Sequence, residues 1–187
     1  MEPPAFILFQ EEITMSSTKK LTTSAICLAL ALLLPFVTGQ IQQIGNMLCP
    51  MHLPVLLCGL LCGWPWGLAV GAMAPLLRSV LFSMPPMFPM AVSMAFELAA
   101  YGAVSGWIFA RTKGEVRDVY LALIPAMVIG RLVWGAVRYA LAGLTGSTFS
   151  FAMFLSGALT TAWPGILLQL ILIPPIVRAL RKSRLMA

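Results

Sequence analysis

Residues 51–82 read MHLPVLLCGLLCGWPWGLAVGAMAPLLRSVLF, and this stretch decides the fold class. Two apolar runs, 53–63 and 68–82, flank the sequence WPWG at 64–67, and Arg78 is the only fixed charge in the stretch. Proline and glycine between two apolar runs predict two helices joined by a short break. The near absence of charge predicts that both helices lie within a membrane.

The composition of the whole chain extends this prediction. The chain has 187 residues, of which 60% are hydrophobic and 10% charged, and its mean hydropathy is +0.94. Soluble domains carry about 25% charged residues, so the composition excludes a soluble enzyme, a nucleic-acid-binding protein and a disordered regulator. Six spans of roughly 20 residues would use most of the chain. We expect one six-helix membrane domain at 19–182, with short tails at 1–18 and 183–187.

Four further apolar runs complete an all-α bundle of six transmembrane helices; they lie at about 21–37, 90–110, 119–143 and 151–177. Nine of the 12 Lys and Arg residues lie near the two termini and in the loop after the fourth run. The loops at 38–52, 83–89 and 144–150 contain no Lys or Arg. Because basic loops stay on the cytoplasmic side, the pattern predicts that both termini are cytoplasmic.

Small residues recur at four-residue spacing in several of these runs. Small residues let helix backbones approach closely in a membrane, where the hydrophobic effect does not drive helix association. Most pairs predict packing within the bundle, whereas an exposed pair on the first helix would suit docking of a partner protein. The pairs are Ala25 and Ala29, Gly59 and Gly63, Gly67 and Gly71, Ala95 and Ala99, and Gly102 and Gly106.

Four ionisable residues lie inside the apolar runs: Arg78, Glu97, Arg131 and Arg138. Charge within a bilayer is costly and usually faces the bundle interior. At about 1.5 Å of rise per residue, all four can converge in the outer half of the bundle. One Glu neutralises only one Arg, so the surplus charge favours a binding site for a ligand with a carboxylate or phosphate. A structural Glu–Arg pair with snorkelling arginines is the alternative.

The neighbouring residues suit a small-molecule pocket with aromatic walls and a few polar anchors. Ser93, Glu97 and Tyr101 share one face of the fourth predicted helix, at four-residue spacing. Trp134 shares a face of the fifth with Arg131 and Arg138. The remaining candidates are Trp163, which precedes Pro164, and the single histidine, His52.

The sequence favours neither a metal site nor a cofactor. The stretch Cys-Pro-Met-His at 49–52 has soft ligands, but no second histidine or carboxylate lies near it in the sequence. We therefore expect His52 to contact an organic ligand, and we expect the four cysteines to be buried thiols that act as small hydrophobes. The chain has no ATP-binding motif and no nucleophile–base pair, so a partner must supply any ATPase activity.

Taken together, these features resemble the substrate-binding S components of energy-coupling factor (ECF) transporters, which import vitamins in prokaryotes. The resemblance covers roughly residues 20–180. It is carried by the pair Ala25 and Ala29, the stretch at 51–82, the loop SMPPMFP at 83–89 and the helix that contains Glu97.

The resemblance implies a pocket that opens outward beneath two gating loops, at about 39–52 and 83–89. Asn46, Met51, Pro86 and Phe88 are the gate residues that we expect to matter. It also implies assembly with a transmembrane coupling protein and two ATPases, with Ala25 and Ala29 on the docking surface. For the substrate, the excess of arginine favours an anionic vitamin such as pantothenate or a folate, whereas Glu97 would suit a thiamin precursor or pyridoxine.

Two further observations bear on this interpretation. The nickel and cobalt proteins related to this family use a histidine at position 2, where this chain has Glu2; a start at Met15 would place Ser16 second. This difference favours an organic substrate. The main alternative is a stand-alone secondary transporter, which would need coupling-ion sites and usually a paired repeat. An intramembrane enzyme and a purely structural membrane subunit are further alternatives.

Overall fold

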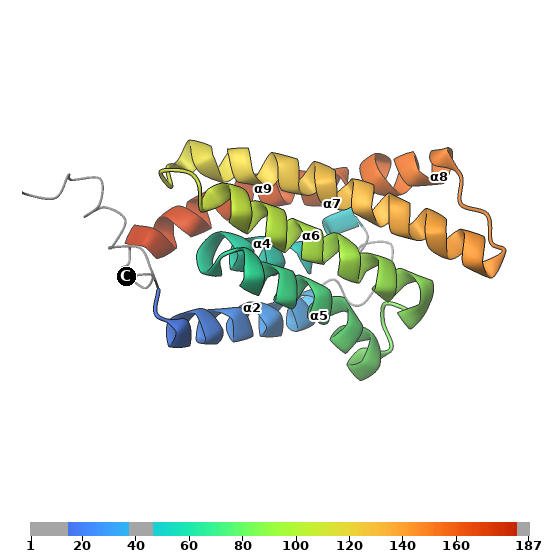
Figure 1. Cartoon of the computed structure of the whole chain (residues 1–187), viewed down its shortest axis with the longest axis horizontal. Coiled ribbons are helices and arrows are strands. Elements are labelled where there is room, and N and C mark those ends of the chain that lie inside the picture. The colour runs from blue at the N-terminus through green and yellow to red at the C-terminus, as the bar shows by residue number, and fades with distance from the viewer. Residues whose placement is uncertain (1–14, 38–46, 183–187) are drawn as a thin grey trace, which may run out of the picture.

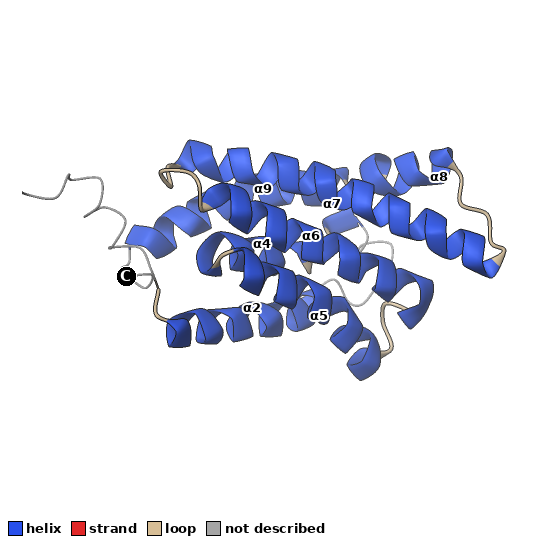
Figure 2. Cartoon of the chain, viewed as in Figure 1, coloured by secondary structure: helices blue, strands red, loops and turns tan. Residues whose placement is uncertain are grey.

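The computed structural model describes residues 15–37 and 47–182, and within these ranges it contains helices and loops but no strand (Figure 2). Six helices correspond to the six predicted runs, and short π-helical or α-helical pieces precede two of them. The helices are α2 (Ser17–Val37), α4 (His52–Cys62), α5 (Trp64–Phe82), α6 (Val92–Phe109, preceded by η1 at Met87–Ala91), α7 (Val116–Thr145) and α9 (Trp163–Lys182, preceded by α8 at Phe151–Leu155 and η2 at Ser156–Thr160).

The long helices form a single bundle (Figure 1). Helix α6 packs against α4, α5 and α7, while α2 packs against α4 and α5. Helix α9 contacts α7 and α4. Because α6 touches three helices, most of its side chains are shielded, and polar residues on α6 are held in the interior.

Five helical segments are long and apolar enough to cross a membrane: Ser17–Val37, Trp64–Phe82, Met87–Phe109, Val116–Thr145 and Phe151–Leu180. The second predicted span is the exception, since α4 has only 11 residues. A helix of that length extends about 16 Å, which is half of a bilayer core of about 30 Å. The described part of the chain is therefore helical, without strands, and holds five candidate spans and one shorter apolar helix.

The break between α4 and α5 lies at Gly63, before the predicted WPWG break. Gly63 has φ +94°, a conformation that side chains with a Cβ rarely adopt. Trp64 already belongs to α5, and Pro65 lies in the first helical turn, where no N–H is needed. The prediction that residues 64–67 form the break was wrong, because all four are helical and α5 begins at Trp64, four residues before the expected start at 68. A proline that starts a helix and one that ends it look alike in sequence.

Close backbone contacts join α4, α5 and α6 at what we call the glycine seam: Gly59, Gly67, Gly71, Gly102 and Gly106. A Cβ at Gly102 would overlap the backbone carbonyl of Gly67, and one at Gly59 would overlap that of Gly102. At Gly106, a Cβ would lie 2.5 Å from the Trp64 backbone nitrogen. The structure thus confirms the close packing that the four-residue spacing predicted.

The two ends of the bundle differ in charge. The basic end holds the start of α2, the end of α9 and the loop between α6 and α7 (Figure 1). The opposite end, which we call the uncharged end, holds the loops at 83–86 and 146–150, which contain no charged residue. At the basic end, α7 begins with a capping box in which Asp118 accepts a 3.0 Å hydrogen bond from the backbone N–H of Glu115.

Candidate functional site

A cluster of buried polar residues lies where α4, α6 and α7 meet, toward the uncharged end. Glu97 of α6 pairs with Arg131 of α7, with 2.9 Å between Arg131 Nη1 and Glu97 Oε1. His52 Nε2, at the first position of α4, lies 3.4 Å from the same carboxylate oxygen. Tyr101 packs edge-on against the His52 ring, with ring centroids 5.1 Å apart. We call Glu97, Arg131, His52 and Tyr101 the polar cluster.

Helix packing explains why the cluster forms. Glu97 and Tyr101 are one turn apart on α6, and each is at most 1% exposed. A Cβ at Gly130 of α7 would lie 3.0 Å from the Tyr101 ring, so this glycine gives the ring room beside α7. Arg131 is the next residue on α7 and reaches Glu97 from the same side. The glycine thus determines how closely the helix that carries Arg131 approaches α6.

Among residues 15–37 and 47–182, two buried nitrogens of the polar cluster have no hydrogen-bond partner: His52 Nδ1 and Arg131 Nε. In the neutral histidine ring, Nε2–H donates to Glu97 and Nδ1 is a bare acceptor. The Nε–H of arginine is a donor. A buried polar atom without a partner costs about 1–3 kcal/mol, so native structures rarely leave one. The charges of Glu97 and Arg131 offset each other, but the hydrogen-bonding capacity of the cluster is not fully used.

Cys49 joins the cluster from the segment that precedes α4, and sequence reasoning missed it. Arg131 Nη2 donates to Cys49 Sγ at 3.4 Å. Burial raises the pKa of the Cys49 thiol above its ordinary value, although the nearby Arg131 guanidinium acts in the opposite direction. Cys49 has a positive φ of 48°, and a turn of this kind in a cysteine leaves no clear signal in the sequence.

Arg78 does not join the polar cluster. It is only 2% exposed, and its guanidinium donates to the backbone carbonyl of Leu32 in α2. The guanidinium also lies over the rings of Phe36 and Phe82, 4.9 and 5.4 Å from their centroids. Arg78 therefore ties α2 to α5. The expected convergence of all four ionisable residues holds for Glu97 and Arg131 alone.

Arg138 lies two turns from Arg131 toward the uncharged end. Its guanidinium is 5.6 Å from the Phe149 ring centroid, and its buried Nε has no hydrogen-bond partner in the part of the chain that the structure describes. Trp134, between the two arginines, packs against Phe149 at 5.8 Å and against Phe154 at 6.2 Å. Within the described residues, Arg138 makes no ion pair with a carboxylate.

A family model now adds to this geometry. The model of the ECF transporter substrate-specific component matches residues 19–177, which is most of the chain. The chain belongs to this family. No curated protein and no solved structure matches it. Family members are transporter subunits, and membership implies a small-molecule substrate together with a membrane coupling protein and ATPases.

Two other predicted site residues of this ECF component, Ser93 and Trp163, lie outside the polar cluster. Ser93 is fully buried on the Glu97 face of α6, but its hydroxyl donates to the Met90 carbonyl at 2.9 Å. Trp163 begins α9 and is 57% exposed, away from the polar cluster. Pro164 is the second residue of α9, and a short break precedes this helix, because η2 ends at Thr160 and α9 starts at Trp163.

The predicted gate residues that the structure describes differ in their exposure to solvent. Met51 is buried and directly precedes α4, next to His52. Pro86 and Phe88 are exposed at the uncharged end, where η1 begins. Asn46 lies outside the described residues. Of the two predicted gates, the structure therefore describes the loop between α5 and α6 and only the last part of the loop after α2.

The pair that we predicted to dock the coupling protein lies on the outer surface of α2. Ala25 and Ala29 are both exposed, while Cys27 and Ala31 on the opposite face are buried against the bundle. Among the described residues, no group of three or more His, Cys, Asp or Glu side chains is placed to hold a metal ion.

Proposed function

We propose that the polar cluster of this ECF S component binds a small water-soluble vitamin or vitamin precursor. The observation that carries the proposal is the buried Glu97–Arg131 pair with His52 beside it, together with the two unpartnered nitrogens. Ionisable residues inside a membrane bundle are costly and usually mark a substrate pathway. A ligand with a hydrogen-bond acceptor for Arg131 and a donor for His52 would satisfy both nitrogens.

An anionic group on the substrate, as in pantothenate or a folate, is part of this proposal. Glu97 already neutralises Arg131, and Arg78 is engaged by α2 and two phenylalanine rings. Arg138 is the remaining arginine of the set, on the same face of α7 as Arg131 and Trp134. Its guanidinium would bind a carboxylate or phosphate, and Trp134 would pack against the body of the substrate.

We further propose that the uncharged end faces outward and the basic end faces the cytoplasm of a prokaryotic cell. The distribution of Lys and Arg supports this orientation. The substrate would then enter from the uncharged end, past the loops that contain Asn46, Met51, Pro86 and Phe88. These loops would cover the polar cluster once the substrate is bound.

The exposed pair Ala25 and Ala29 would meet the transmembrane coupling protein, which carries the two ATPase subunits. Small residues allow a partner helix to approach the α2 backbone closely. Their exposure on α2 supports this assignment. ATP hydrolysis by the partners would then drive release of the substrate on the cytoplasmic side.

A thermal-shift screen of the detergent-purified protein tests the proposal. The panel contains vitamins and their precursors, both anionic and neutral. A ligand present at 100 times its dissociation constant adds about 2.7 kcal/mol of apparent stability. We expect a hit in the wild type that disappears in Arg138→Gln if the hit is anionic. An anionic hit that stabilises both proteins equally would refute the role of Arg138, and the absence of any hit would refute the vitamin proposal.

A further inference from the structure

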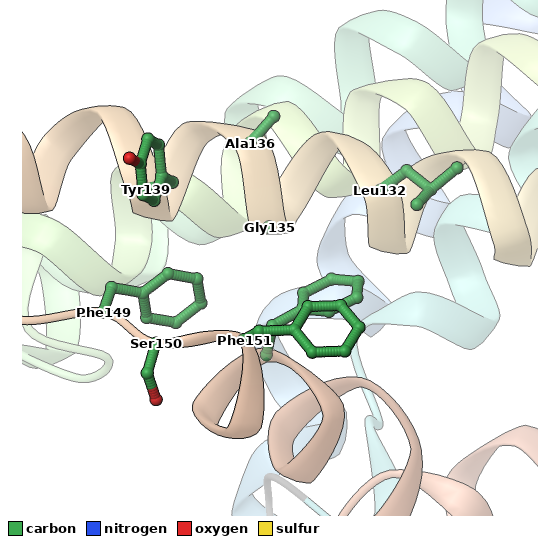
Figure 3. Close-up of a pocket in the computed structure, with 8 residues that line it drawn as sticks. Leu132, Gly135, Ala136, Tyr139, Phe149, Ser150 and Phe151 are labelled. Carbon is green, nitrogen blue, oxygen red and sulfur yellow. The ribbon is translucent and has the colours of Figure 1, made fainter.

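An apolar groove lies between α7 and the segment that leads into α8, outside the polar cluster. Its volume is about 350 Å³ (Figure 3). A Cβ at Gly135 would lie 2.5 Å from the Phe154 ring, so this glycine lets the ring approach the floor of the groove. The lining residues are Leu132, Gly135, Ala136, Tyr139, Phe149, Ser150, Phe151 and Phe154.

The groove opens away from the bundle. Leu132 and Tyr139 are 57% and 72% exposed, and they continue a stripe of exposed residues on α7 that includes Ile124 and Val128. Positions three or four residues apart share one face of a helix. In a chain with several membrane spans, an apolar face that no other helix covers meets lipid hydrocarbon.

The length of α7 places the groove at a particular depth. The helix has 30 residues, and at 1.5 Å per residue it extends about 45 Å, which exceeds a bilayer core of about 30 Å. A span of about 20 residues that begins at Asp118, in the first turn of α7, ends near Tyr139. Tyrosine is enriched at this boundary between hydrocarbon and head groups. Leu132, about 10 Å deeper along the helix, then lies within the hydrocarbon.

The size and lining of the groove limit what it can hold. A helix with its side chains is about 10–12 Å wide, so one turn occupies more than about 400 Å³ and would not fit. The side chains that line the groove are apolar except for the hydroxyl groups of Tyr139 and Ser150, and the Ser150 hydroxyl accepts a hydrogen bond from the Met153 backbone at 3.3 Å. In Figure 3 the Ser150 side chain points away from α7. A charged, water-soluble ligand would find no anchor among these residues.

We propose that this groove binds one acyl chain of a membrane phospholipid. The chain lies along Leu132, Gly135 and Ala136 between the phenylalanine rings, and the ester region of the lipid lies beside the Tyr139 hydroxyl. The proposal uses no residue of the polar cluster and does not depend on the identity of the substrate. It rests on the membrane location of the chain and on the geometry of the groove.

Photocrosslinking tests the proposal. The full-length protein is reconstituted into phosphatidylcholine vesicles that contain a small fraction of phosphatidylcholine with a diazirine on its acyl chain. After illumination, mass spectrometry maps the labelled residues. We expect the lining residues of the groove to be labelled several-fold more than Ile124 and Val128, which face lipid without a groove.

Matched variants separate a specific site from general lipid contact. Ala136→Phe fills the groove and should reduce labelling at Leu132 and Phe151 to the level of Val128. The control Val128→Phe adds the same side chain to the same exposed stripe and should leave groove labelling unchanged. Leu132→Trp is a second groove-filling variant in case Ala136→Phe does not fold. Equal labelling along the stripe in the wild type, or equal loss in Ala136→Phe and Val128→Phe, would overturn the proposal.

Discussion

Helix α6 takes part in two kinds of contact, and they differ in what holds the helices together. At the glycine seam, Gly102 and Gly106 bring backbones into direct contact and leave no space between α4, α5 and α6. At the polar cluster, the large side chains of Glu97 and Tyr101 lie between the helices. The ion pair between Glu97 and Arg131 joins α6 to α7. The seam consists of glycines and has no polar side chain to satisfy, whereas two side-chain nitrogens of the cluster lack a hydrogen-bond partner among the described residues. The comparison separates a closely packed contact between backbones from a contact made by side chains, at which we propose that a ligand binds.

The largest effect on stability should come from breaking the ion pair of the polar cluster. Glu97→Ala leaves the Arg131 guanidinium buried without its counter-charge, and breaking a buried pair costs about 3–5 kcal/mol. We expect a large fall in thermal stability of the purified protein. The double variant Glu97→Gln, Arg131→Gln removes both charges and should recover most of the stability without recovering substrate binding. If Glu97→Ala unfolds at the wild-type temperature, the pair is not stabilising.

A substitution at the glycine seam should have the next largest effect. Gly102→Ala introduces a methyl group that overlaps the Gly67 backbone, and overpacking typically costs about 1–3 kcal/mol. The matched control is Gly143→Ala, because a Cβ at Gly143 of α7 meets no atom within 4 Å. Thermal unfolding of both variants tests the seam. Equal stability of the two variants would contradict its close packing.

Removal of the Arg78 contacts should have an effect on stability of similar size. Arg78→Met keeps an apolar stem but loses the hydrogen bond to Leu32, and hydrogen bonds from charged donors contribute about 1.5–3 kcal/mol. We expect lower thermal stability with little change in substrate affinity, because Arg78 lies outside the polar cluster. A variant with normal stability but weak substrate binding would place Arg78 in the binding site instead.

The smallest effect on stability should come from the exposed face of α2. Ala29→Trp adds a large side chain at a site that faces away from the bundle, so unfolding and substrate binding should change little. Assembly with the coupling protein should be lost, as measured by co-purification. The control Leu33→Trp, one turn further along the exposed face, tests how local the docking surface is. Normal assembly of Ala29→Trp would refute the docking assignment.

The sequence was sufficient to predict the helices and the seam, because both depend on local patterns. Apolar runs set the helix positions, and glycines four residues apart marked the contact surfaces that α4, α5 and α6 use. The length of α4 was also visible, since the run at 53–63 is short. The start of α5 was missed by four residues, since it lies at Trp64 and not at 68.

The candidate site was harder to predict. Sequence gives the height of a residue along its helix but not the direction in which the helix is rotated within the bundle. Glu97 and Arg131 meet as expected, whereas Arg78, at a comparable height, faces α2 and binds the Leu32 carbonyl. The contact of Cys49 with Arg131 depends on a turn at Cys49 that no local sequence pattern predicts.

The most direct test of the account is the equilibrium affinity of the screened ligand for the wild type and for His52→Phe. Phenylalanine retains the edge-on packing against Tyr101 and removes the unpartnered Nδ1 along with the donor to Glu97. The account predicts at least a tenfold loss of affinity, about 1.4 kcal/mol, with thermal stability of the unliganded protein close to that of the wild type. Unchanged affinity in a stable His52→Phe protein would show that the substrate does not bind at the polar cluster.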